Sequence, residues 1–474
     1  MTAQEHAMWV GGEALPASRM YEVRLPYDGS VTARVAEGDA ASLEAACEAA
    51  QVGAGSMAAL SNAGRSDLLL RAAGLLQRDV AEFANLLTLE TGKPIKEARV
   101  EAERGYQTLV ASAIAARELA GEAIPIDGVP AGRGRLAITI REPLGIIGAI
   151  TPFNLPLNLA LHKVGPALAG GNAVIHKPSE RTPLTAIRLA QLLHEAGAPA
   201  GAYNVVTGSG GEVGQKLVTD ARVRMITFTG SAAVGKLIRA SAGLKRVTLE
   251  LGGNAGLIVD GDADLDLAVE RAVPGAFLYS GQICISVQRI FVHESVVEKF
   301  TNLFLAATAK LRIGHPLDET TDIASLISEE EARRVVTWIG DAVACGATLL
   351  AGGQRTRATV TPAILANVPP SAKMSCGEVF GPVVSINAFS DLNAAIDAVN
   401  NTPYGLQAGI FTQNLERAFR AARRLHAGGV IINDIPGFRA DNMPYGGVKE
   451  SGVGREGPRY AIEEMTETKL ICWR

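Results

Sequence analysis

The sequence predicts an α/β protein with a doubly wound parallel sheet, a second α/β domain and a small β element outside both cores. The chain of 474 residues is too long for one hydrophobic core. Short apolar runs alternate with helical stretches between residues 145 and 251, and a second alternation follows from about 255 to 445. This spacing is typical of parallel sheets with helical crossovers. Two strand-like segments, 136–140 and 468–473, fit neither series, and pairing with another subunit is one way to cover their edges.

The first 120 residues are expected to form a short extended start followed by helices. Apolar residues recur with helical spacing between Leu68 and Leu76, and the segment 102–120 has the same character. The charged run 101–104 is interpreted as a solvated helix face.

The two alternating series predict individual elements. In the first, the expected strands are 145–150, 173–175, 204–206, 225–228 and 247–251, and the helices between them are 160–169, 184–195, 213–218 and 234–240. In the second, strands are expected near 256–259, 289–292, 383–386 and 430–433. Ligands of such sheets bind at the carboxyl ends of the strands, where the loops are rich in glycine.

Composition excludes several classes of protein. Hydrophobic residues make up 47% and charged residues 20%, which argues against disorder. The net charge of −4 gives no reason to expect nucleic acid, and no run of about eighteen apolar residues predicts a membrane span. The N-terminus lacks the pattern of a secretory signal. Five cysteines, odd in number and never in a CxxC pair, favour a reduced, cytoplasmic setting over disulfides or a metal site.

Cys284 is a candidate nucleophile, directly after a Gly-containing turn in the segment 280–286. A small, flexible residue at the turn permits close approach of substrate to the sulfur. The alternative is a buried structural thiol, the usual fate of a lone cysteine. An unperturbed thiol is only about 3% ionised at neutral pH, so a functional Cys284 needs a positive or dipolar neighbour.

Polar groups follow the predicted strands at their carboxyl ends. Glu250 could act as a general base if burial raised its pKa; alternatively it is a surface glutamate at a turn. Ser231 follows a Gly turn at a helix start, where it could meet a phosphate or serve as an N-cap. The Gly-rich stretch 208–214 is spaced one residue too long for a dinucleotide fingerprint.

Two further loops carry polar groups. Lys177 and Glu180 could hold ribose hydroxyls, and the carboxylate would repel a 2′-phosphate. Alternatively this segment is a capped helix start with Pro178 in the first turn. Asn154 is a neutral amide donor in a loop between two prolines.

The order of these segments is more specific than any one of them. They are Phe-Asn between prolines (152–156), His-Lys-Pro-Ser-Glu (176–180), Phe-Thr-Gly-Ser (228–231), Glu-Leu-Gly-Gly (250–253), Gly-Gln-x-Cys (281–284), Glu-Val-Phe-Gly-Pro (378–382) and Pro-Tyr-Gly-Gly-Val-Lys-x-Ser-Gly (444–452). Together they resemble the aldehyde dehydrogenase superfamily over nearly the whole chain. The segment 433–447 looks like the branch of lactaldehyde, glycolaldehyde and non-phosphorylating glyceraldehyde-3-phosphate dehydrogenases.

The resemblance implies a reaction and a catalytic site. Cys284 is the implied nucleophile, Asn154 and the backbone N–H of Cys284 form the implied oxyanion hole, and Glu250 is the implied base. The aldehyde is oxidised to the carboxylate through a thiohemiacetal and a thioester on sulfur. Lys163 lies near this site without an assigned role.

The resemblance also implies NAD, or NADP, as the cofactor. Lys177 and Glu180 would contact the adenosine ribose, Ser231 the pyrophosphate and Glu378 the nicotinamide ribose, with Phe380 beside the nicotinamide. The full set of implied cofactor residues is Thr151, Pro152, Phe153, Lys177, Ser179, Glu180, Gly210, Gly214, Phe228, Gly230, Ser231, Val234, Leu251, Gly252, Glu378 and Phe380.

The implied domains follow the family pattern. A Rossmann-like cofactor domain spans 1–123 and 141–251, and a catalytic domain spans 252–445. The segments 124–140 and 446–474 are oligomerisation or bridging segments, with the oligomerisation strands near 124–140 and 466–474. A homodimer or homotetramer is the implied assembly.

Three residues concern the aldehyde. His162 and Arg439 fall where other members of the family place aromatic residues, and a His–Arg pair would favour a polar or anionic tail. Alternatively His162 is a satisfied helix histidine and Arg439 forms a surface ion pair with Asp441. Ile283 stands where members acting on phosphonate-type substrates have arginine, which favours small hydroxyaldehydes such as lactaldehyde or glycolaldehyde over anionic semialdehydes or phosphorylated aldehydes.

Two other functions are weighed against this one. An acylating dehydrogenase would pass the thioester to coenzyme A, and Glu250 argues against it because a water-activating base would hydrolyse the intermediate. A binding or structural role predicts the loss of Cys284, Glu250 or Asn154, and all three are present.

Overall fold

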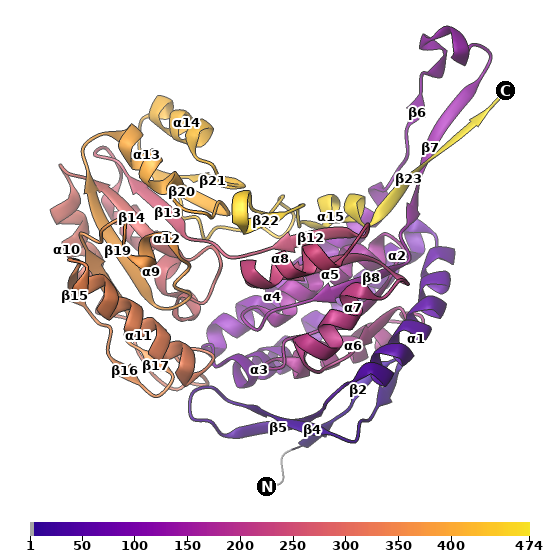
Figure 1. Cartoon of the computed structure of the whole chain (residues 1–474), viewed down its shortest axis with the longest axis horizontal. Helices are drawn as coiled ribbons and strands as arrows, with labels where there is room; N and C mark the ends of the chain where they lie inside the picture. Colours follow the sequence, from indigo (N-terminus) through magenta and orange to yellow (C-terminus); the bar gives the residue numbers. More distant parts are fainter. Residues whose placement is uncertain (1–3) are drawn as a thin grey trace.

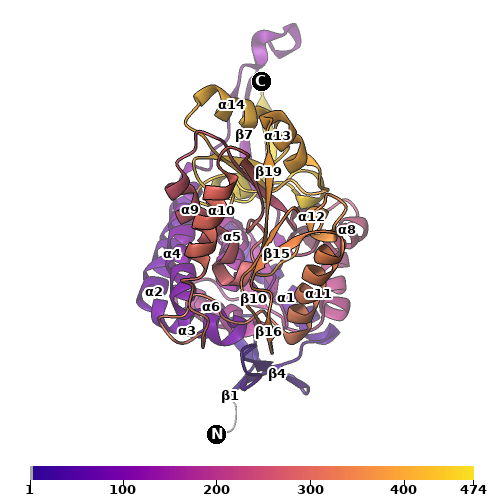
Figure 2. The same cartoon turned by 90° about the vertical axis from the view of Figure 1, so that its left-hand side faces the viewer.

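The computed structural model describes residues 4–474. They form two α/β lobes and a narrow β arm that projects from the first lobe (Figure 1). The arm and the N-terminal strands β4 (Met20–Arg24) and β5 (Val31–Ala36) lie at opposite ends of the molecule in both views (Figure 2). None of the helices within residues 4–474 is long and apolar enough to cross a membrane.

The first lobe is built on an eight-stranded sheet of order β22-β12-β11-β8-β9-β10-β2-β3. In that order the strands span Gly452–Val453, Arg246–Glu250, Val223–Thr229, Ile146–Ile150, Ala173–Lys177, Tyr203–Val205, Met8–Val10 and Glu13–Leu15. The five strands from β12 to β10 are parallel, and β22, β2 and β3 extend the sheet with antiparallel pairing. The predicted parallel sheet is confirmed, with each predicted strand within two residues of the observed one.

Both faces of this sheet are covered by helices. Side chains alternate across a strand, so in β9 Val174 packs with α2, α4, α5 and α6, whereas Ala173 and Ile175 pack with α1, α7 and α8. The helices of this lobe are α1 (Ala40–Ala59), α2 (Asn62–Arg78), α3 (Val80–Thr91), α4 (Ile95–Glu118), α5 (Pro156–Ala169), α6 (Pro183–Glu195), α7 (Gln215–Thr219), α8 (Ala232–Ser241) and the π-helix η3 (Gly210–Gly214). The helix predicted at 213–218 is therefore divided between η3 and α7.

The second lobe contains a seven-stranded sheet of order β15-β18-β19-β14-β13-β20-β21. In that order the strands span Thr348–Ala351, Ala363–Ala366, Val383–Phe389, Val287–His293, Ala255–Val259, Gln407–Phe411 and Gly429–Ile432. All pairs are parallel except β15 with β18. The sequence did not predict β15, β18 or β20; β20 begins with the polar Gln407, and Gly409, which has low strand propensity, interrupts its apolar run.

Helices cover this second sheet as well. One face packs against α9 (Leu265–Phe277) and α10 (Val297–Thr308), and the other against α13 (Leu392–Asn400) and α14 (Leu415–Arg424). A separate cluster joins α11 (Glu329–Ala344) and α12 (Lys373–Cys376) to β18. In Figure 2 this lobe faces the viewer, with β19 running between α10 and α11.

The arm is a three-stranded sheet of order β23-β7-β6. Its strands are β6 (Ala123–Ile124), β7 (Leu136–Pro143) and β23 (Thr466–Trp473), and β23 pairs antiparallel with the whole of β7. The two predicted strands outside the cores are thus partners of one another. The segment 446–474 does not belong to the arm as a whole: β22 joins the first sheet, and α15 (Pro458–Glu464) packs against α4 and α5.

Short elements complete the chain. The N-terminal sheet has the order β1-β5-β4 and precedes the four long helices, as the sequence predicts. The remaining short elements are β1 (Gln4–His6), β16 (Arg355–Thr356), β17 (Thr359–Val360) and the 3-10 helices η1 (Ile126–Gly128), η2 (Pro130–Gly132), η4 (Leu278–Gly281) and η5 (Lys449–Ser451).

Candidate active site

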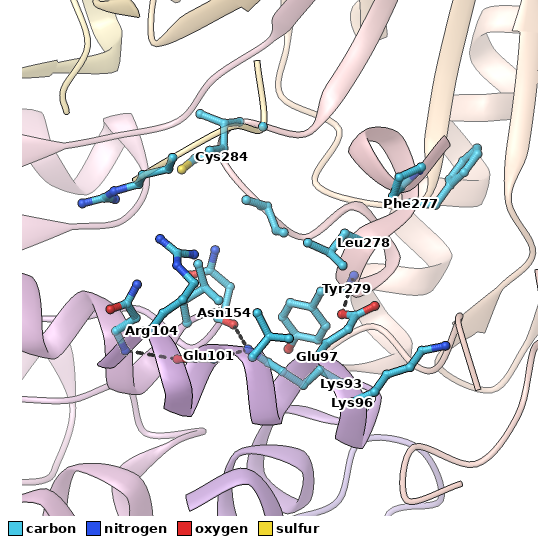
Figure 3. A pocket seen from close by; sticks show the side chains of 18 of the residues that line it. Lys93, Lys96, Glu97, Glu101, Arg104, Asn154, Phe277, Leu278, Tyr279 and Cys284 are labelled. Atoms are coloured by element: carbon cyan, nitrogen blue, oxygen red, sulfur yellow. Dashed lines mark hydrogen bonds and ion pairs between the residues drawn. The ribbon is translucent and has the colours of Figure 1, made fainter. Parts of the chain in front are cut away.

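A cavity of about 460 Å³ lies where α4 and the start of α5 in the first lobe meet residues of the second lobe (Figure 3). Its wall includes Cys284, Asn154, Ile283 and Arg439, four residues that the sequence placed at the site. They are separated by up to 285 positions along the chain, so the fold alone brings them together. The apolar part of the wall comes from Leu155, Leu159, Pro274, Phe277, Leu278 and Ile285.

Cys284 follows a sharp turn that carries it into this cavity. Tyr279, Ser280 and Gly281 have φ angles of 47°, 51° and 71°, three consecutive residues in the left-handed region. A Cβ at Gly281 would lie 2.1 Å from the backbone oxygen of Gly381, so glycine is required there. Left-handed conformations of Tyr and Ser are costly and persist where surrounding contacts impose them.

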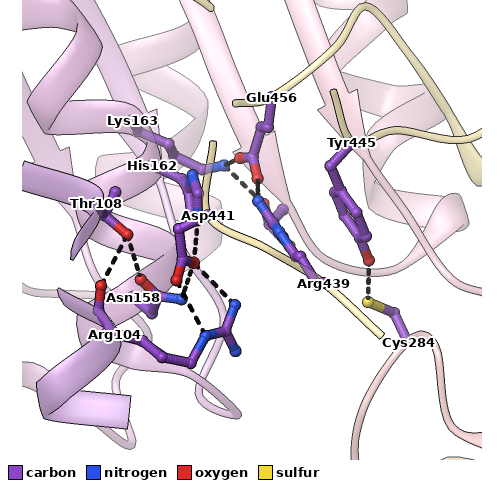
Figure 4. Close-up of polar contacts among 11 residues, drawn as sticks. Arg104, Thr108, Asn158, His162, Lys163, Cys284, Arg439, Asp441, Tyr445 and Glu456 are labelled. Carbon is purple, nitrogen blue, oxygen red and sulfur yellow. Dashed lines mark hydrogen bonds and ion pairs between the residues drawn. The ribbon is translucent and has the colours of Figure 1, made fainter. Parts of the chain in front are cut away.

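The Cys284 thiol has two neighbours that favour its ionised form. The sulfur lies 3.0 Å from the Tyr445 hydroxyl, and the Arg439 guanidinium stacks 3.7 Å from the centroid of the Tyr445 ring (Figure 4). Burial nevertheless raises the pKa of the thiol to about 12, against the lowering effects of the Tyr445 hydrogen bond and Arg439. The positive and dipolar neighbours that the sequence analysis required are therefore Arg439 and Tyr445.

Replacing Tyr445 by phenylalanine should slow alkylation of Cys284 by iodoacetamide. The thiolate would lose its hydroxyl donor, and a hydrogen bond to a charged acceptor contributes roughly 1.5 kcal/mol, so the thiol pKa should rise by about one unit. Below its pKa the thiolate fraction falls about tenfold for each such unit, so the rate at pH 8 should fall about tenfold. Tyr106→Phe, which removes a hydroxyl on α4 outside the cavity, is the control. Equal rates in wild type and Tyr445→Phe would show that the hydroxyl does not stabilise the thiolate.

Asn154 lies against the loop that carries Cys284. Its side chain is buried, and Nδ2 donates one hydrogen bond to the backbone oxygen of Gln282 at 3.0 Å. A carboxamide nitrogen has two hydrogens, so one is used to orient the group and the other is available to an oxygen in the cavity. This arrangement suits the oxyanion-hole role that the sequence predicts.

Glu250 ends β12 and is buried, which excludes the alternative of a surface glutamate. Neither carboxylate oxygen has a hydrogen-bond partner among the described residues. Burial and the nearby Glu456 raise the pKa of Glu250 well above its ordinary value, and Arg439 and Lys163 oppose that rise. A buried carboxyl group whose pKa is raised in this way is suited to accept a proton as a general base.

A buried ionic cluster stands beside Glu250. Glu456 accepts from Lys163 at 2.5 Å and from Arg439 at 3.1 Å (Figure 4), and Lys163 also donates to Thr229 at 2.6 Å. Burial would raise the pKa of Glu456, but Lys163 and Arg439 outweigh it and hold the pKa below its ordinary value. Arg439 therefore pairs with Glu456 in the interior and forms no surface ion pair with Asp441.

His162 does not line the cavity, and its predicted role in contacting the aldehyde has to be corrected. Its side chain is fully buried and lies 3.1 Å from Asp441. Burial lowers the pKa of His162 to about 4, so the ring is neutral at physiological pH. The direction of a side chain on a helix whose residues are all buried is set by tertiary packing, which the sequence does not display.

Sequence reasoning missed the contribution of α4 to the cavity. The interpretation of 101–104 as a solvated face is wrong for Glu101, which is 2% exposed. Arg104 also lines the cavity and donates to Asp441 at 2.8 Å. Glu97, Glu101 and Arg104 recur at spacings of four and three, a signal that marks one helix face but does not tell whether water or a cavity covers it.

The predicted cofactor residues gather at one edge of the first sheet, at the carboxyl ends of its parallel strands. Thr151, Pro152 and Phe153 follow β8, while Lys177 ends β9. Phe228 lies near the end of β11, and the others follow β9, β10, β11 and β12 or come from the second lobe: Ser179, Glu180, Gly210, Gly214, Gly230, Ser231, Val234, Leu251, Gly252, Glu378 and Phe380. This edge is where ligands of doubly wound sheets bind.

The chemistry of this edge fits a dinucleotide. Glu378 accepts from the Gly253 N–H at 2.9 Å, and burial raises its pKa to about 7 although that hydrogen bond lowers it. The rings of Phe380 and Phe153 meet edge to face at 5.9 Å. Ser231 caps α8 by accepting from the Val234 N–H at 3.4 Å, so its N-cap role is confirmed. Its contact with a phosphate stays a prediction.

Comparisons with known proteins identify the family of the chain. A family model described as the aldehyde dehydrogenase family matches residues 10–471. The 3-sulfolactaldehyde dehydrogenase of Priestia aryabhattai is 48% identical over 407 residues, which cover 86% of this chain and 85% of that protein.

Two solved structures share the fold over their full length. Aldehyde dehydrogenase 21 from Physcomitrella patens, in complex with the reaction product succinate, has a TM-score of 0.98 at 38% identity and covers 100% of this chain and 99% of its own. Glyceraldehyde-3-phosphate dehydrogenase GapN from Methanocaldococcus jannaschii, complexed with NADP, has a TM-score of 0.92 at 42% identity and covers 96% and 99%. The chain therefore belongs to the aldehyde dehydrogenase family and is an NAD(P)-dependent oxidoreductase that acts on aldehydes.

Proposed function

We propose that the chain oxidises a short aldehyde whose tail carries a hydroxyl or, preferentially, an anionic group. The observation that carries this proposal is the pair of guanidinium groups, Arg104 and Arg439, in the wall of the cavity that holds Cys284. Guanidinium binds carboxylate, sulfonate and phosphate oxygens in fixed geometry. Arg104 on α4 supplies the cation that Ile283 does not, which shifts the preference away from plain hydroxyaldehydes such as lactaldehyde and glycolaldehyde.

Both arginines keep donors for a ligand. Arg104 uses Nε and Nη2 to hold Asp441, at 3.2 and 2.8 Å, and Arg439 uses Nη2 to hold Glu456. The remaining wall is largely apolar, so an anion that enters meets little competing water. The names of similar proteins support both kinds of tail: one relative is named for 3-sulfolactaldehyde and the moss enzyme is complexed with succinate, whereas several other relatives are named lactaldehyde dehydrogenase.

The residues support a mechanism in two halves. The Cys284 thiolate adds to the carbonyl carbon, and the Asn154 carboxamide and the Cys284 backbone N–H receive the developing oxyanion. When bound, NAD(P)+ supplies the acceptor for the hydride that leaves the carbon. Glu250 then takes a proton from a water that attacks the thioester, and the Tyr445 hydroxyl donates to the sulfur as it departs. The carboxylic acid product and the protonated Glu250 each lose a proton to solvent, so the carboxylate is released and the Cys284 thiolate returns.

The alternative of acyl transfer to coenzyme A ends in a different product. We propose hydrolysis because Glu250, which is not itself on the cavity wall, is near enough to Cys284 to raise the pKa of its thiol, and its carboxylate oxygens have no hydrogen-bond partner among the described residues. Product analysis in the presence of coenzyme A separates the two functions: hydrolysis gives the carboxylate, and acyl transfer gives acyl-CoA.

Removing the guanidinium of Arg104 should change substrate preference. For Arg104→Met, kcat/KM for succinic semialdehyde should fall about a hundredfold, since a lost charge-assisted pair costs roughly 3 kcal/mol, while propionaldehyde should change less than about threefold. Arg99→Met removes an arginine on the same helix outside the cavity and serves as the control. An unchanged ratio between the two aldehydes in Arg104→Met would refute an anionic tail site. Measuring kcat/KM for both aldehydes with NAD+ and with NADP+ also gives the cofactor preference.

For the cofactor we propose that NAD+ is preferred. Glu180 lies at the carboxyl end of β9 and pairs with Lys177 at 2.7 Å, and its negative charge would repel a 2′-phosphate. The carboxylate is half exposed, and the pairing holds it at the strand end.

For the assembly we propose a homodimer or homotetramer built through the arm. The outer strand β23 presents Leu470, Ile471 and Trp473 to solvent, an exposed apolar edge of the kind that another subunit covers. We place the protein in the cytoplasm, where its five free cysteines would stay reduced.

A further inference from the structure

A buried ion pair on one side of the cavity has no part in the mechanism above. Lys93 and Glu101 form it, and each side chain is 1% exposed (Figure 3). Taking two charges out of water is expensive unless their remaining hydrogen-bonding groups are satisfied. The partners of this pair therefore show what it supports.

Lys93 holds the loop of the predicted oxyanion donor. Its Nζ donates to the backbone oxygen of Asn154 at 2.7 Å. The same Nζ lies 4.6 Å from the centroid of the Tyr279 ring, in the turn that precedes Cys284. One buried cation thus contacts both sides of the reaction site.

Glu101 holds the residues that follow Asn154. Its second carboxylate oxygen accepts from the N–H groups of Leu157 at 3.0 Å and Asn158 at 3.2 Å, in the first turn of α5. The N-cap residue of that helix, Leu155, has no polar side chain, so Glu101 takes over the capping. Asn154 is therefore fixed by Lys93 at its own carbonyl and by Glu101 through the helix start behind it.

We propose that Lys93, held by Glu101, is a positioning residue that aims the Asn154 carboxamide at the oxygen of the reacting carbonyl. Without the cation, the Asn154 backbone carbonyl loses its donor, and the loop between β8 and α5 can shift relative to Gln282 and Cys284. A misplacement of about 1 Å in such a group lowers the rate about a hundredfold. The effect falls on steps that develop an oxyanion and spares steps that do not.

Two reagents that attack the same sulfur separate these steps. 4-Nitrophenyl acetate acylates the Cys284 thiolate through a tetrahedral oxyanion, whereas iodoacetamide alkylates it by direct displacement without one. For Lys93→Met we expect the acylation rate to fall about a hundredfold and the alkylation rate to change less than about threefold. Neither reagent depends on the aldehyde proposed above, so the outcome is independent of the substrate proposal.

A double-mutant cycle identifies the route of the effect. If Lys93 acts through Asn154, Lys93→Met should slow acylation less than about threefold in the Asn154→Ala background, because the donor it positions is already gone. Multiplicative losses would overturn the proposal, and so would equal slowing of both reagents or no slowing of either.

Stability is controlled separately, because Lys93→Met leaves the buried Glu101 without its counter-ion. The neutral variant Lys93→Met/Glu101→Gln removes both charges and keeps an acceptor for the start of α5, and it should show the same selective loss of acylation. Leu68→Ala, in the core of the neighbouring helix α2, lowers stability without touching Asn154. Leu68→Ala should leave the ratio of the acylation rate to the alkylation rate unchanged. A selective fall of the acylation rate in Leu68→Ala would overturn the proposal.

Discussion

Replacing Cys284 by alanine should abolish aldehyde oxidation, lowering kcat by at least about four orders of magnitude. No other residue on the cavity wall is a cysteine, serine or threonine, so the described cavity offers no substitute of that kind for the covalent step. NAD(P)H formation from succinic semialdehyde, followed by absorbance, measures the loss.

Cofactor binding and folding distinguish lost chemistry from a damaged protein. Cys284→Ala should bind NAD+ and melt as the wild type does, because the side chain contributes one hydrogen bond and little volume to the wall. Cys345→Ala, at an exposed thiol after α11, is the matched control and should retain full activity. Substantial turnover in Cys284→Ala would contradict the assignment of the nucleophile.

Replacing Glu250 by glutamine should separate the two halves of the reaction. The variant should release a burst of about one NADH per subunit and then stop, because general base catalysis contributes roughly two to four orders of magnitude to the second half. Stopped-flow absorbance resolves the two phases. If the burst is lost together with turnover, Glu250 acts before the thioester forms, and the proposed sequence of steps is wrong.

The pH dependence of the second phase follows from the burial of Glu250. A general base works in its ionised form, and burial together with Glu456 raises the pKa of Glu250. Thioester hydrolysis in the wild type should therefore accelerate as pH rises through the raised pKa of Glu250, above the range of an ordinary carboxyl group, and this ascending limb should disappear in Glu250→Gln. Glu90→Gln is the matched control: Glu90 is a second buried carboxylate, with a pKa raised by burial to about 8, and it caps α6 away from the cavity. It should retain both phases and the ascending limb.

The parallel sheets could be predicted because their strands are buried on both faces. Runs such as 173–175 and 256–259 are continuous and apolar, and the spacing of the helices between them is regular. β20 escaped prediction because a central strand can tolerate Gln407 and Gly409 when both neighbours pair with it. Propensity is a weak guide where the sheet itself supplies the stability.

The candidate site could be predicted where its chemistry depends on residue type, but not where it depends on the direction in which a side chain points. Cys284 and Asn154 lie on one cavity wall as predicted, since few residue types can serve as a nucleophile or a neutral donor. His162 is hydrogen-bonded to Asp441 and does not line the cavity, whereas Arg104 does. The sequence of a helix does not show which neighbouring element contacts a given polar side chain. Lys93 and Glu101 illustrate the same limit, because their pairing depends on how α4 packs against the start of α5.

The most direct test of the account is to trap the covalent intermediate on Cys284. Glu250→Gln would be mixed with succinic semialdehyde and NAD+, quenched in acid and digested, and the peptides weighed by mass spectrometry. We predict a succinyl thioester on the peptide that contains Cys284, in about the same amount as the NADH burst, and none in Cys284→Ala/Glu250→Gln. An NADH burst without an acyl group on Cys284, or with the acyl group on another residue, would contradict the central claim.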